Sequence, residues 1–154
     1  MTPIDGLFEV HLPVRDLDRA IGFYRDKLRL PLARIFPERS VAFFWVGAPG
    51  AAMLGLWCTG DSPLTTTSHT AFRTSIEALL QACQSLNDAG ITPLNFSGQP
   101  AAEPEVLAWM PALSLYFRDP DGNLLEFLAM LAEPARPELG VVPWSAWRNS
   151  TAPR

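Results

Sequence analysis

Hydrophobic and polar residues alternate along the first segment of the chain that predicts regular structure. Residues 8–14 (FEVHLPV) carry an apolar side chain at every second position, and Glu9, His11 and Pro13 stand between them. A period of two is typical of a strand with one buried face. We therefore expect a strand over this segment, with His11 on the face that points away from the core.

A helical spacing follows this strand. Apolar side chains recur every three or four residues over residues 17–28, and Asp16 before them is a residue type that caps helices. Pro31 ends the helical region, and GAPG at residues 47–50 marks a turn between two later strands. The order β-α-β-β-β is therefore predicted for the first part of the chain. Its last three strands are expected at residues 32–36, 41–46 and 52–58.

The same order of elements is predicted a second time after a polar segment. Residues 59–68 (TGDSPLTTTS) are typical of a linker, and residues 69–74 (HTAFRT) alternate as a strand does. A helix is expected next, with Ser75 or Thr74 as its N-cap and Gly90 at its end. The sequence therefore predicts an internal repeat. Its remaining segments are a helix over residues 76–89, a strand over 91–96, a connection over 97–111 and a closing hairpin over 114–130.

The closing hairpin has the clearest local signals. Ser114–Met130 (SLYFRDPDGNLLEFLAM) contains two strand-like runs around the turn sequence Asp-Pro-Asp-Gly. Pro120 fixes φ, the Asp119 side chain can accept backbone N–H bonds, and Gly122 tolerates a positive φ. The return strand carries Glu126 where an apolar residue would be expected. A carboxylate in that place is either solvated on an open face or, if buried, paired, hydrogen-bonded or bound to a metal.

The two histidines of the chain are the second set of candidate residues. His11 lies in the first strand of the first repeat and His69 in the first strand of the second. Glu126 lies in the last strand of the second repeat, and pairing MLGLW with LLEFL gives Gly55 as its counterpart. Each histidine by itself is compatible with a surface side chain. Together with Glu126 they form a set typical of a divalent metal with open coordination positions, and Gly55 would leave the coordination incomplete.

Composition narrows the class of protein. The chain has 154 residues, 48% of them hydrophobic, and a net charge of −4, with a pI near 5.1. We expect no nucleic-acid partner and no membrane association, because the chain has no basic patch and no apolar run of about 20 residues. Cys58 and Cys83 lie in apolar patterns and predict reduced thiols in a cytoplasmic protein.

The length suits a single domain built from the two repeats. Module one is expected at about residues 6–58, the linker at 59–68, module two at about 69–131 and a C-terminal arm at 132–154. The arm is rich in proline and contains Trp144 and Trp147. Two interpretations of it stay open: a segment that packs on the body or on a partner chain, or a flexible tail.

Three stretches of the chain carry a resemblance to a known family: FEVHLPVRDLDRAIGFYRDKL, SHTAFRTS and YFRDPDGNLLEF. They resemble the vicinal oxygen chelate superfamily of glyoxalases, bleomycin-resistance proteins and ring-cleaving dioxygenases, over about residues 7–131. The resemblance implies an α+β fold in which two βαβββ modules form a metal-binding cup. It also implies that His11, His69 and Glu126 match the family's ligand positions for one divalent metal per site. Imidazole and carboxylate ligands do not distinguish Zn²⁺, Mn²⁺, Fe²⁺ and Ni²⁺.

The resemblance further implies a metal-dependent enzyme that acts on a small molecule through two adjacent oxygens. Glyoxalase I relatives carry a fourth carboxylate at the place of Gly55, and extradiol dioxygenases depend on a further histidine that this chain lacks. Thiol transferases of the fosfomycin type share the SxYF strand, matched by Ser114 and Tyr116, but have a threonine where Pro13 stands. A lyase or a thiol transferase, with a thiol co-substrate left open, is therefore favoured over a dioxygenase. The alternative is a ligand-sequestering, bleomycin-resistance-type binding protein without catalysis.

Tyr116, Arg73 and Ser114 are the candidate catalytic residues. Strand parity places Ser114 and Tyr116 on one face, where Tyr116 offers a hydrogen-bond donor or acid, and Arg73 offers a positive charge. The alternative for each is a buried partner or a surface side chain. Met53 and Trp57 share the face of Gly55, and they line an apolar substrate wall or belong to the core.

A homodimer is also expected. The short thiol-transferase relatives that the chain resembles build each metal site from two chains. By this resemblance, His11 of one chain joins His69 and Glu126 of its neighbour, an exchange that two-fold symmetry allows.

Overall fold

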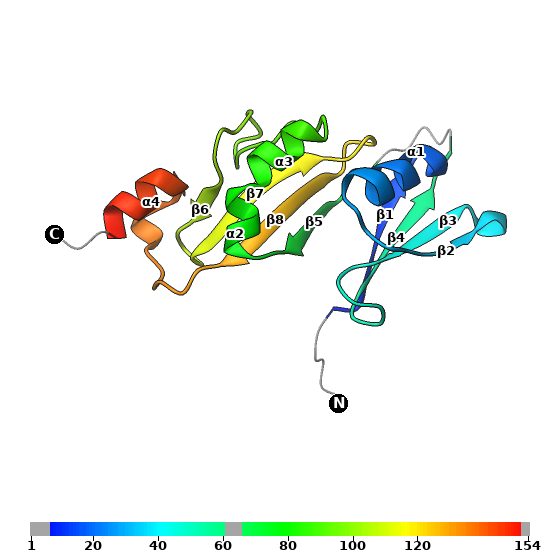
Figure 1. Ribbon diagram of the computed structural model, residues 1–154, viewed down its shortest axis with the longest axis horizontal. Coiled ribbons are helices and arrows are strands. Elements are labelled where there is room, and N and C mark those ends of the chain that lie inside the picture. Colours follow the sequence, from blue (N-terminus) through cyan, green and yellow to red (C-terminus); the bar gives the residue numbers. More distant parts are fainter. Residues whose placement is uncertain (1–6, 61–65, 152–154) are drawn as a thin grey trace. The chain divides into compact units, whose positions relative to one another are not determined.

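The structure, a computed structural model, describes residues 7–60 and 66–151, which form two compact units (Figure 1). Unit 1 contains the described residues up to Ser68 together with Asp119–Asn123. Unit 2 contains His69–Arg118 and the described residues from Leu124 onward. The first residue of the expected module one, residues 61–65 of the expected linker and residues 152–154 of the expected arm lie outside the described residues.

Unit 1 is built on a four-stranded sheet with the order β1-β4-β3-β2. β1 (Glu9–Val14) is parallel to β4 (Met53–Cys58), and β3 (Val41–Trp45) is antiparallel to both β4 and β2 (Leu32–Phe36). The strands predicted from the alternation are confirmed, because each bound lies within one residue of the expected position. Along β1, Leu12 is buried whereas the next residue toward the N-terminus, His11, is exposed.

The helical segment of unit 1 begins as the capping pattern predicts. α1 (Leu17–Gly22) continues directly into a π-helical turn, η1 (Phe23–Lys27). The side chain of Asp16 accepts a hydrogen bond from the backbone N–H of Arg19 at 2.9 Å, which satisfies one of the free donors at the helix start. α1 contacts β3 and β4, so its apolar side covers one face of the sheet.

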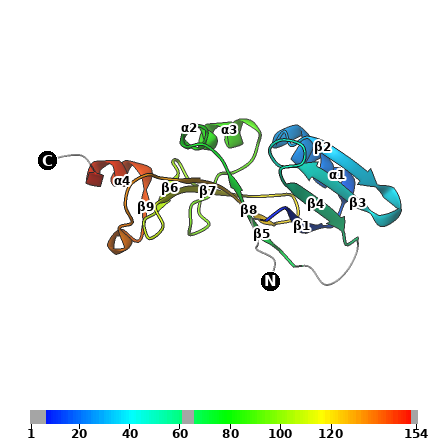
Figure 2. The ribbon, with the colours of Figure 1, turned by 90° about the horizontal axis from the view of Figure 1, so that it is seen from below.

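Unit 2 contains a five-stranded sheet with the order β5-β8-β7-β6-β9. β5 (His69–Arg73) is parallel to β8 (Leu124–Met130), and β7 (Ala112–Arg118) is antiparallel to β8, which confirms the predicted closing hairpin. α2 (Ile76–Leu80) and α3 (Ala82–Asp88) lie on one side of this sheet (Figure 2). The two sheets with their helices confirm the α+β class.

The helix expected over residues 76–89 is divided at Gln81, between α2 and α3. Its predicted start is confirmed, because the Ser75 hydroxyl accepts the backbone N–H of Ala78 at 3.1 Å. Its predicted end is also confirmed, because Gly90 has a φ of +69°. A positive φ is the conformation for which glycine is favoured at a helix C-terminus.

The prediction of a strand over residues 91–96 is wrong. Only Leu94 pairs there, through backbone hydrogen bonds of 2.7 and 3.0 Å with Tyr116. Pro93 has no N–H to donate, and Asn95 starts a turn in which it accepts the N–H of Gly98 at 2.9 Å. β6 (Glu105–Leu107), from the segment expected to be a connection, pairs with β7 instead.

The C-terminal segment packs on unit 2, so of the two open interpretations the packed arm is confirmed. A short 3-10 helix, η3 (Pro137–Leu139), precedes β9 (Val141–Pro143), which is antiparallel to β6 and extends the sheet. α4 (Trp144–Thr151) follows. Trp147 in α4 is fully buried, with the guanidinium of Arg136 5.4 Å from the centre of its ring. This indole anchors the segment by burying a large apolar surface.

The Asp-Pro-Asp-Gly turn of the hairpin has the predicted geometry. The Asp119 carboxylate accepts the backbone N–H groups of Asp121 at 2.9 Å and Asn123 at 2.8 Å. Gly122 has a φ of +88°, which an L-residue with a side chain rarely adopts. The hairpin turn is therefore fixed by its own sequence, as the pattern predicts.

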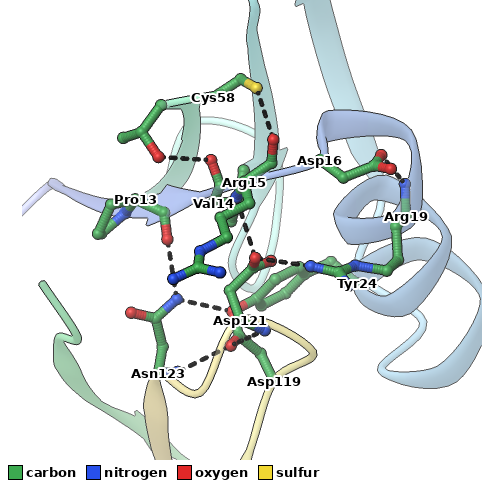
Figure 3. Close-up of polar contacts among 11 residues, drawn as sticks. Pro13, Val14, Arg15, Asp16, Arg19, Tyr24, Cys58, Asp119, Asp121 and Asn123 are labelled. Carbon is green, nitrogen blue, oxygen red and sulfur yellow. Dashed lines mark hydrogen bonds and ion pairs between the residues drawn. The ribbon is translucent and has the colours of Figure 1, made fainter. Parts of the chain in front are cut away.

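The same turn is part of unit 1, where polar contacts hold it (Figure 3). The Tyr24 hydroxyl donates to Asp119 at 3.0 Å. The backbone N–H of Arg15 and the guanidinium of Arg19 donate to Asp121 at 2.9 and 2.7 Å. Burial raises the pKa of Tyr24 far above its usual value, and the negative charge of Asp119 adds to the effect. Tyr24 therefore stays a hydrogen-bond donor to Asp119 throughout the neutral range.

Among the described residues, no helix has the length and apolar character needed to cross a membrane.

Candidate metal centre

Glu126 lies on one face of the unit 2 sheet together with the other candidate residues of this unit. In β8 it pairs with Ala71 of β5 and with Tyr116 of β7. Paired residues point to the same face of a sheet, so Tyr116 and Glu126 share a face, and His69 and Ser114 stand two residues away on it. Glu126 is only 3% exposed. The solvated alternative for this carboxylate is therefore wrong.

Both oxygens of the Glu126 carboxylate have a partner. The Ser114 hydroxyl donates to Oε1 at 2.5 Å, and Nε2 of His69 lies 3.0 Å from Oε2. Ser114 is buried, whereas the side chain of His69 is half exposed. The carboxylate thus joins a buried hydroxyl on one side to an accessible imidazole on the other. This is the arrangement that lets a strand retain a buried carboxylate.

Tyr116 lies beside this pair. Its ring centroid is 6.1 Å from that of His69 and 6.2 Å from that of Phe96. Burial raises the pKa of Tyr116 to about 12, and the charge of the nearby Glu126 carboxylate also raises it. The phenol is therefore neutral at physiological pH and can donate a hydrogen bond or a proton. Arg73 lies at the exposed end of β5. Its side chain forms no hydrogen bond or ion pair within the described residues, so its role stays a prediction.

His11 lies on the unit 1 sheet between a tryptophan and a carboxylate. The indole N–H of Trp57 donates to Nδ1 of His11, and Nε2 of His11 lies 2.5 Å from an Oε1 oxygen of Glu9. The imidazole also makes edge-on contacts with Trp57 and with Phe43, with ring centroids 5.7 Å apart in each pair. Both ring nitrogens of His11 are therefore engaged within unit 1.

Gly55 makes room for this imidazole. It is the direct partner of His11 in the β1–β4 pairing. A Cβ atom on Gly55 would contact Nδ1 of His11 and would lie 2.6 Å from Cε1 and 3.2 Å from Cγ, closer than carbon atoms pack. The sequence predicts that Gly55 leaves a coordination position empty. The structure gives a second physical reason for glycine at this position, since a side chain here would displace His11.

The pairing of the strands corrects the predicted correspondence between the histidines of the two repeats. His11 pairs with Gly55 in unit 1, whereas Ala71 pairs with Glu126 in unit 2. If Gly55 corresponds to Glu126, the residue in the place of His69 is Glu9. On that correspondence, the prediction that the two histidines occupy matching positions in the two repeats is wrong by two residues. A shift of two keeps a side chain on the same face, so alternation alone could not reveal it.

Sequence reasoning missed Glu9 and the indole N–H of Trp57 as partners of His11. A signal for both was present, because Glu9 alternates onto the face of His11 and Trp57 onto the face of Gly55. What the sequence could not provide was the register between β1 and β4, which places these side chains together.

The side chains at both places are of the chemical types that bind divalent metals. A carboxylate and an imidazole nitrogen are ligands that zinc and related metals accept, and each unit carries one such pair: Glu9 with His11 in unit 1 and Glu126 with His69 in unit 2. Within residues 7–60 and 66–151, no group of three or more His, Cys, Asp or Glu side chains capable of holding a metal is found. Each unit by itself therefore offers two donors.

Unit 1 is a β-α-β-β-β unit, and strand β8 of unit 2 carries a buried glutamate beside a histidine of β5. Together these features define an α+β protein of the glyoxalase type. The chain belongs to the Glyoxalase/Bleomycin resistance protein/Dioxygenase superfamily, whose family model matches residues 6–127. The resemblance seen in the sequence is thereby confirmed. No curated protein matches the chain.

Solved structures with this fold are found in several organisms. An integron cassette protein, HFX_CASS4, from the mobile metagenome of the Halifax Harbour sewage outfall is 30% identical, with a TM-score of 0.71 over 82% of this chain and 100% of its own. Lactoylglutathione lyase from Agrobacterium tumefaciens is 23% identical, with a TM-score of 0.63 over 83% of this chain and 96% of its own. A glyoxalase/bleomycin resistance protein/dioxygenase from Nocardioides is 23% identical, with a TM-score of 0.64 over 88% of this chain and 89% of its own. The last two show the fold alone.

Proposed function

We propose that this chain is a divalent-metal-dependent enzyme that acts on a small substrate through two adjacent oxygens, as a lyase or a thiol transferase. The observation that carries the proposal is the Glu126 carboxylate, which is buried in a strand and lies 3.0 Å from the accessible His69 imidazole. The proposed ligand set is His69 and Glu126 with a further donor from β1, where the sequence predicts His11. The superfamily membership and the lactoylglutathione lyase with the same fold support an enzyme.

The residues around this pair have complementary proposed roles. A bound divalent cation supplies a Lewis-acid charge at substrate oxygens. The Ser114 hydroxyl donates a hydrogen bond to Oε1 of Glu126, and Oε2 faces His69. Tyr116, kept neutral by a pKa of about 12, donates a hydrogen bond or a proton to a substrate oxygen that gains negative charge. Arg73 provides a positive charge for an anionic substrate group.

The test is a substrate screen on protein stripped with a chelator and reloaded with Zn²⁺, Mn²⁺, Fe²⁺ or Ni²⁺. Hydroxycarbonyl and epoxide substrates would be offered with and without a thiol. We expect turnover with at least one metal, and we expect Tyr116→Phe to lower kcat about 10²- to 10⁴-fold while metal content is kept. Binding of substrates without turnover under every metal would contradict the enzyme proposal.

A second candidate function, sequestration of a ligand, is favoured by the aromatic face of unit 1. Trp57 and Phe36 lie on the β-sheet of this unit, and a guanidinium stacks on each: Arg39 4.9 Å from the Trp57 ring centroid and Arg34 4.6 Å from that of Phe36. Such a surface suits flat anionic molecules. Quenching of tryptophan fluorescence by aromatic acids in metal-free protein, with no product formed, would favour this function.

We also propose a homodimer in which β1 of one chain supplies the third donor to His69 and Glu126 of its neighbour. β1 and β5 are edge strands of their own sheets, and edge strands present unpaired backbone groups. Equal amounts of a Glu9→Ala, His11→Ala chain and a Glu126→Gln chain would be unfolded and refolded together. With random pairing, about a quarter of all sites should regain every ligand. Recovery of no tight sites would exclude sharing between chains.

A further inference from the structure

The hydrogen bonds of His11 fix which of its nitrogens carries the proton. An indole N–H can only donate, so Nδ1 of His11, which receives the Trp57 N–H, has no proton. A neutral imidazole then has its proton on Nε2, and Nε2 is the atom that faces the Glu9 carboxylate at 2.5 Å. Both contacts therefore require the same tautomer. Trp57 selects it from one side and Glu9 accepts from it on the other.

This tautomer has no free lone pair for a metal. An imidazole binds a metal through an unprotonated nitrogen. In His11 the unprotonated nitrogen is occupied by Trp57, and the other nitrogen is protonated. Glu9 retains more capacity, because an ionised carboxylate has about four lone-pair positions and only Oε1 contacts His11. The side chain of Glu9 is 35% exposed, so its carboxylate is accessible.

We propose that Glu9 is the metal-contacting residue of β1 and that His11 is a positioning residue, which donates from Nε2–H to the carboxylate and holds it in place. The strand register supports this assignment, because Glu9 stands in the place that His69 has in unit 2. Gly55 provides the space for the imidazole, and the Trp57 N–H holds its tautomer. Trp57, His11 and Glu9 thus form one hydrogen-bonded chain. The inference rests on the proposed metal-dependent function.

The experiment is a ¹⁵N-detected NMR measurement of the imidazole nitrogens in the full chain, at about pH 8, where imidazole is ordinarily neutral. The chain has only two histidines, so His69→Ala assigns both sets of signals. In metal-free protein we expect His11 with its proton on Nε2. On addition of Zn²⁺, we expect the signals of His69 to change to those of a metal-bound imidazole while His11 keeps its tautomer.

The outcomes separate this inference from the function on which it rests. If His69 and His11 both become metal-bound, the enzyme proposal stands and the assignment of Glu9 is overturned. If His69 does not respond to Zn²⁺, the metal site itself is refuted, and this inference with it. A proton on Nδ1 of His11 in metal-free protein would also overturn the inference.

A pair of tryptophan variants tests the positioning role. Trp57→Phe keeps the aromatic ring and deletes the N–H, so Nδ1 of His11 loses its donor and its ¹⁵N signal should shift, while the Glu9 carboxylate still accepts from Nε2–H. Zn²⁺ affinity should fall about 10- to 100-fold, as is usual when a residue that orients a ligand is lost. Trp45→Phe is the matched control, since Trp45 lies on the neighbouring strand β3 and pairs with Met53. A Zn²⁺ affinity of Trp57→Phe no lower than that of Trp45→Phe would contradict the positioning role.

Discussion

Removal of the Ser114 hydroxyl tests how the buried Glu126 carboxylate is held. The hydroxyl donates to Oε1 at 2.5 Å, and both residues are almost completely buried. A hydrogen bond to a charged group contributes about 1.5–3 kcal/mol. Ser114→Ala removes one oxygen atom and leaves Oε1 without its donor. We therefore expect the free energy of unfolding of metal-free protein to fall by about 1.5–3 kcal/mol.

The assay is urea unfolding followed by tryptophan fluorescence, on metal-free protein because a bound metal would itself stabilise the native state. Ser145→Ala is the matched control. The Ser145 hydroxyl donates to Glu103 at 2.7 Å, which is the same pair of residue types at an exposed position. Exposed substitutions of this kind usually change stability by no more than about 0.5 kcal/mol.

A double-mutant cycle completes this test. In a Glu126→Leu background, Ser114→Ala should no longer lower the stability, because the acceptor of its hydrogen bond is absent. If Ser114→Ala in the otherwise unchanged protein costs no more than Ser145→Ala, the hydroxyl does not hold an ionised carboxylate. The Ser114 hydroxyl would then have no role in stabilising the buried Glu126 carboxylate.

Three further predictions follow from the geometry. Gly55→Ala should displace the His11 imidazole, because the new methyl group would lie 2.6 Å from Cε1, and the loss of the His11 N–H signal in NMR would show this. Ultraviolet titration of the folded protein should detect no tyrosinate near pH 10, since burial raises the pKa of both tyrosines, that of Tyr116 to about 12. The tyrosines of the unfolded chain keep the ordinary pKa, so the free energy of unfolding should fall as the pH rises from about 10 to 12. Ionisation of the folded protein at pH 10 would contradict this. Turnover of the hemithioacetal of methylglyoxal and glutathione should stay below the enzyme median of about 10 per second, because Gly55 offers no fourth carboxylate, and a rate near that median in a stopped assay would contradict it.

Local sequence signals predicted most of the fold. The alternation around His11, the caps at Asp16 and Ser75 and the turn at Gly122 each depend on a few neighbouring residues, and each is present in the structure. The strand expected at residues 91–96 failed because Pro93 and the turn at Asn95 limit pairing to Leu94. The alternation of apolar residues carries no information on this limit to pairing.

The sequence predicted the residue types of the candidate site but not all of their contacts, because these contacts depend on how the strands pair. The position of Glu126 in a strand could be read from the hairpin, but its contact with His69 depends on the register between β5 and β8. The partners of His11 depend on the register between β1 and β4 in the same way. Register is set by contacts between strands that are distant in the sequence, and a shift of two residues preserves the pattern of faces.

The metal content of the purified protein shows whether His69 and Glu126 belong to a metal site. The wild-type chain and His69→Ala would be loaded with Zn²⁺, dialysed extensively and analysed for metal by mass spectrometry. We expect about one tightly bound ion per wild-type chain and loss of most of it in His69→Ala, since removal of one ligand leaves an incomplete set. A wild-type chain without stoichiometric metal, or a His69→Ala chain that retains the wild-type content, would show that His69 is not a ligand of a metal site.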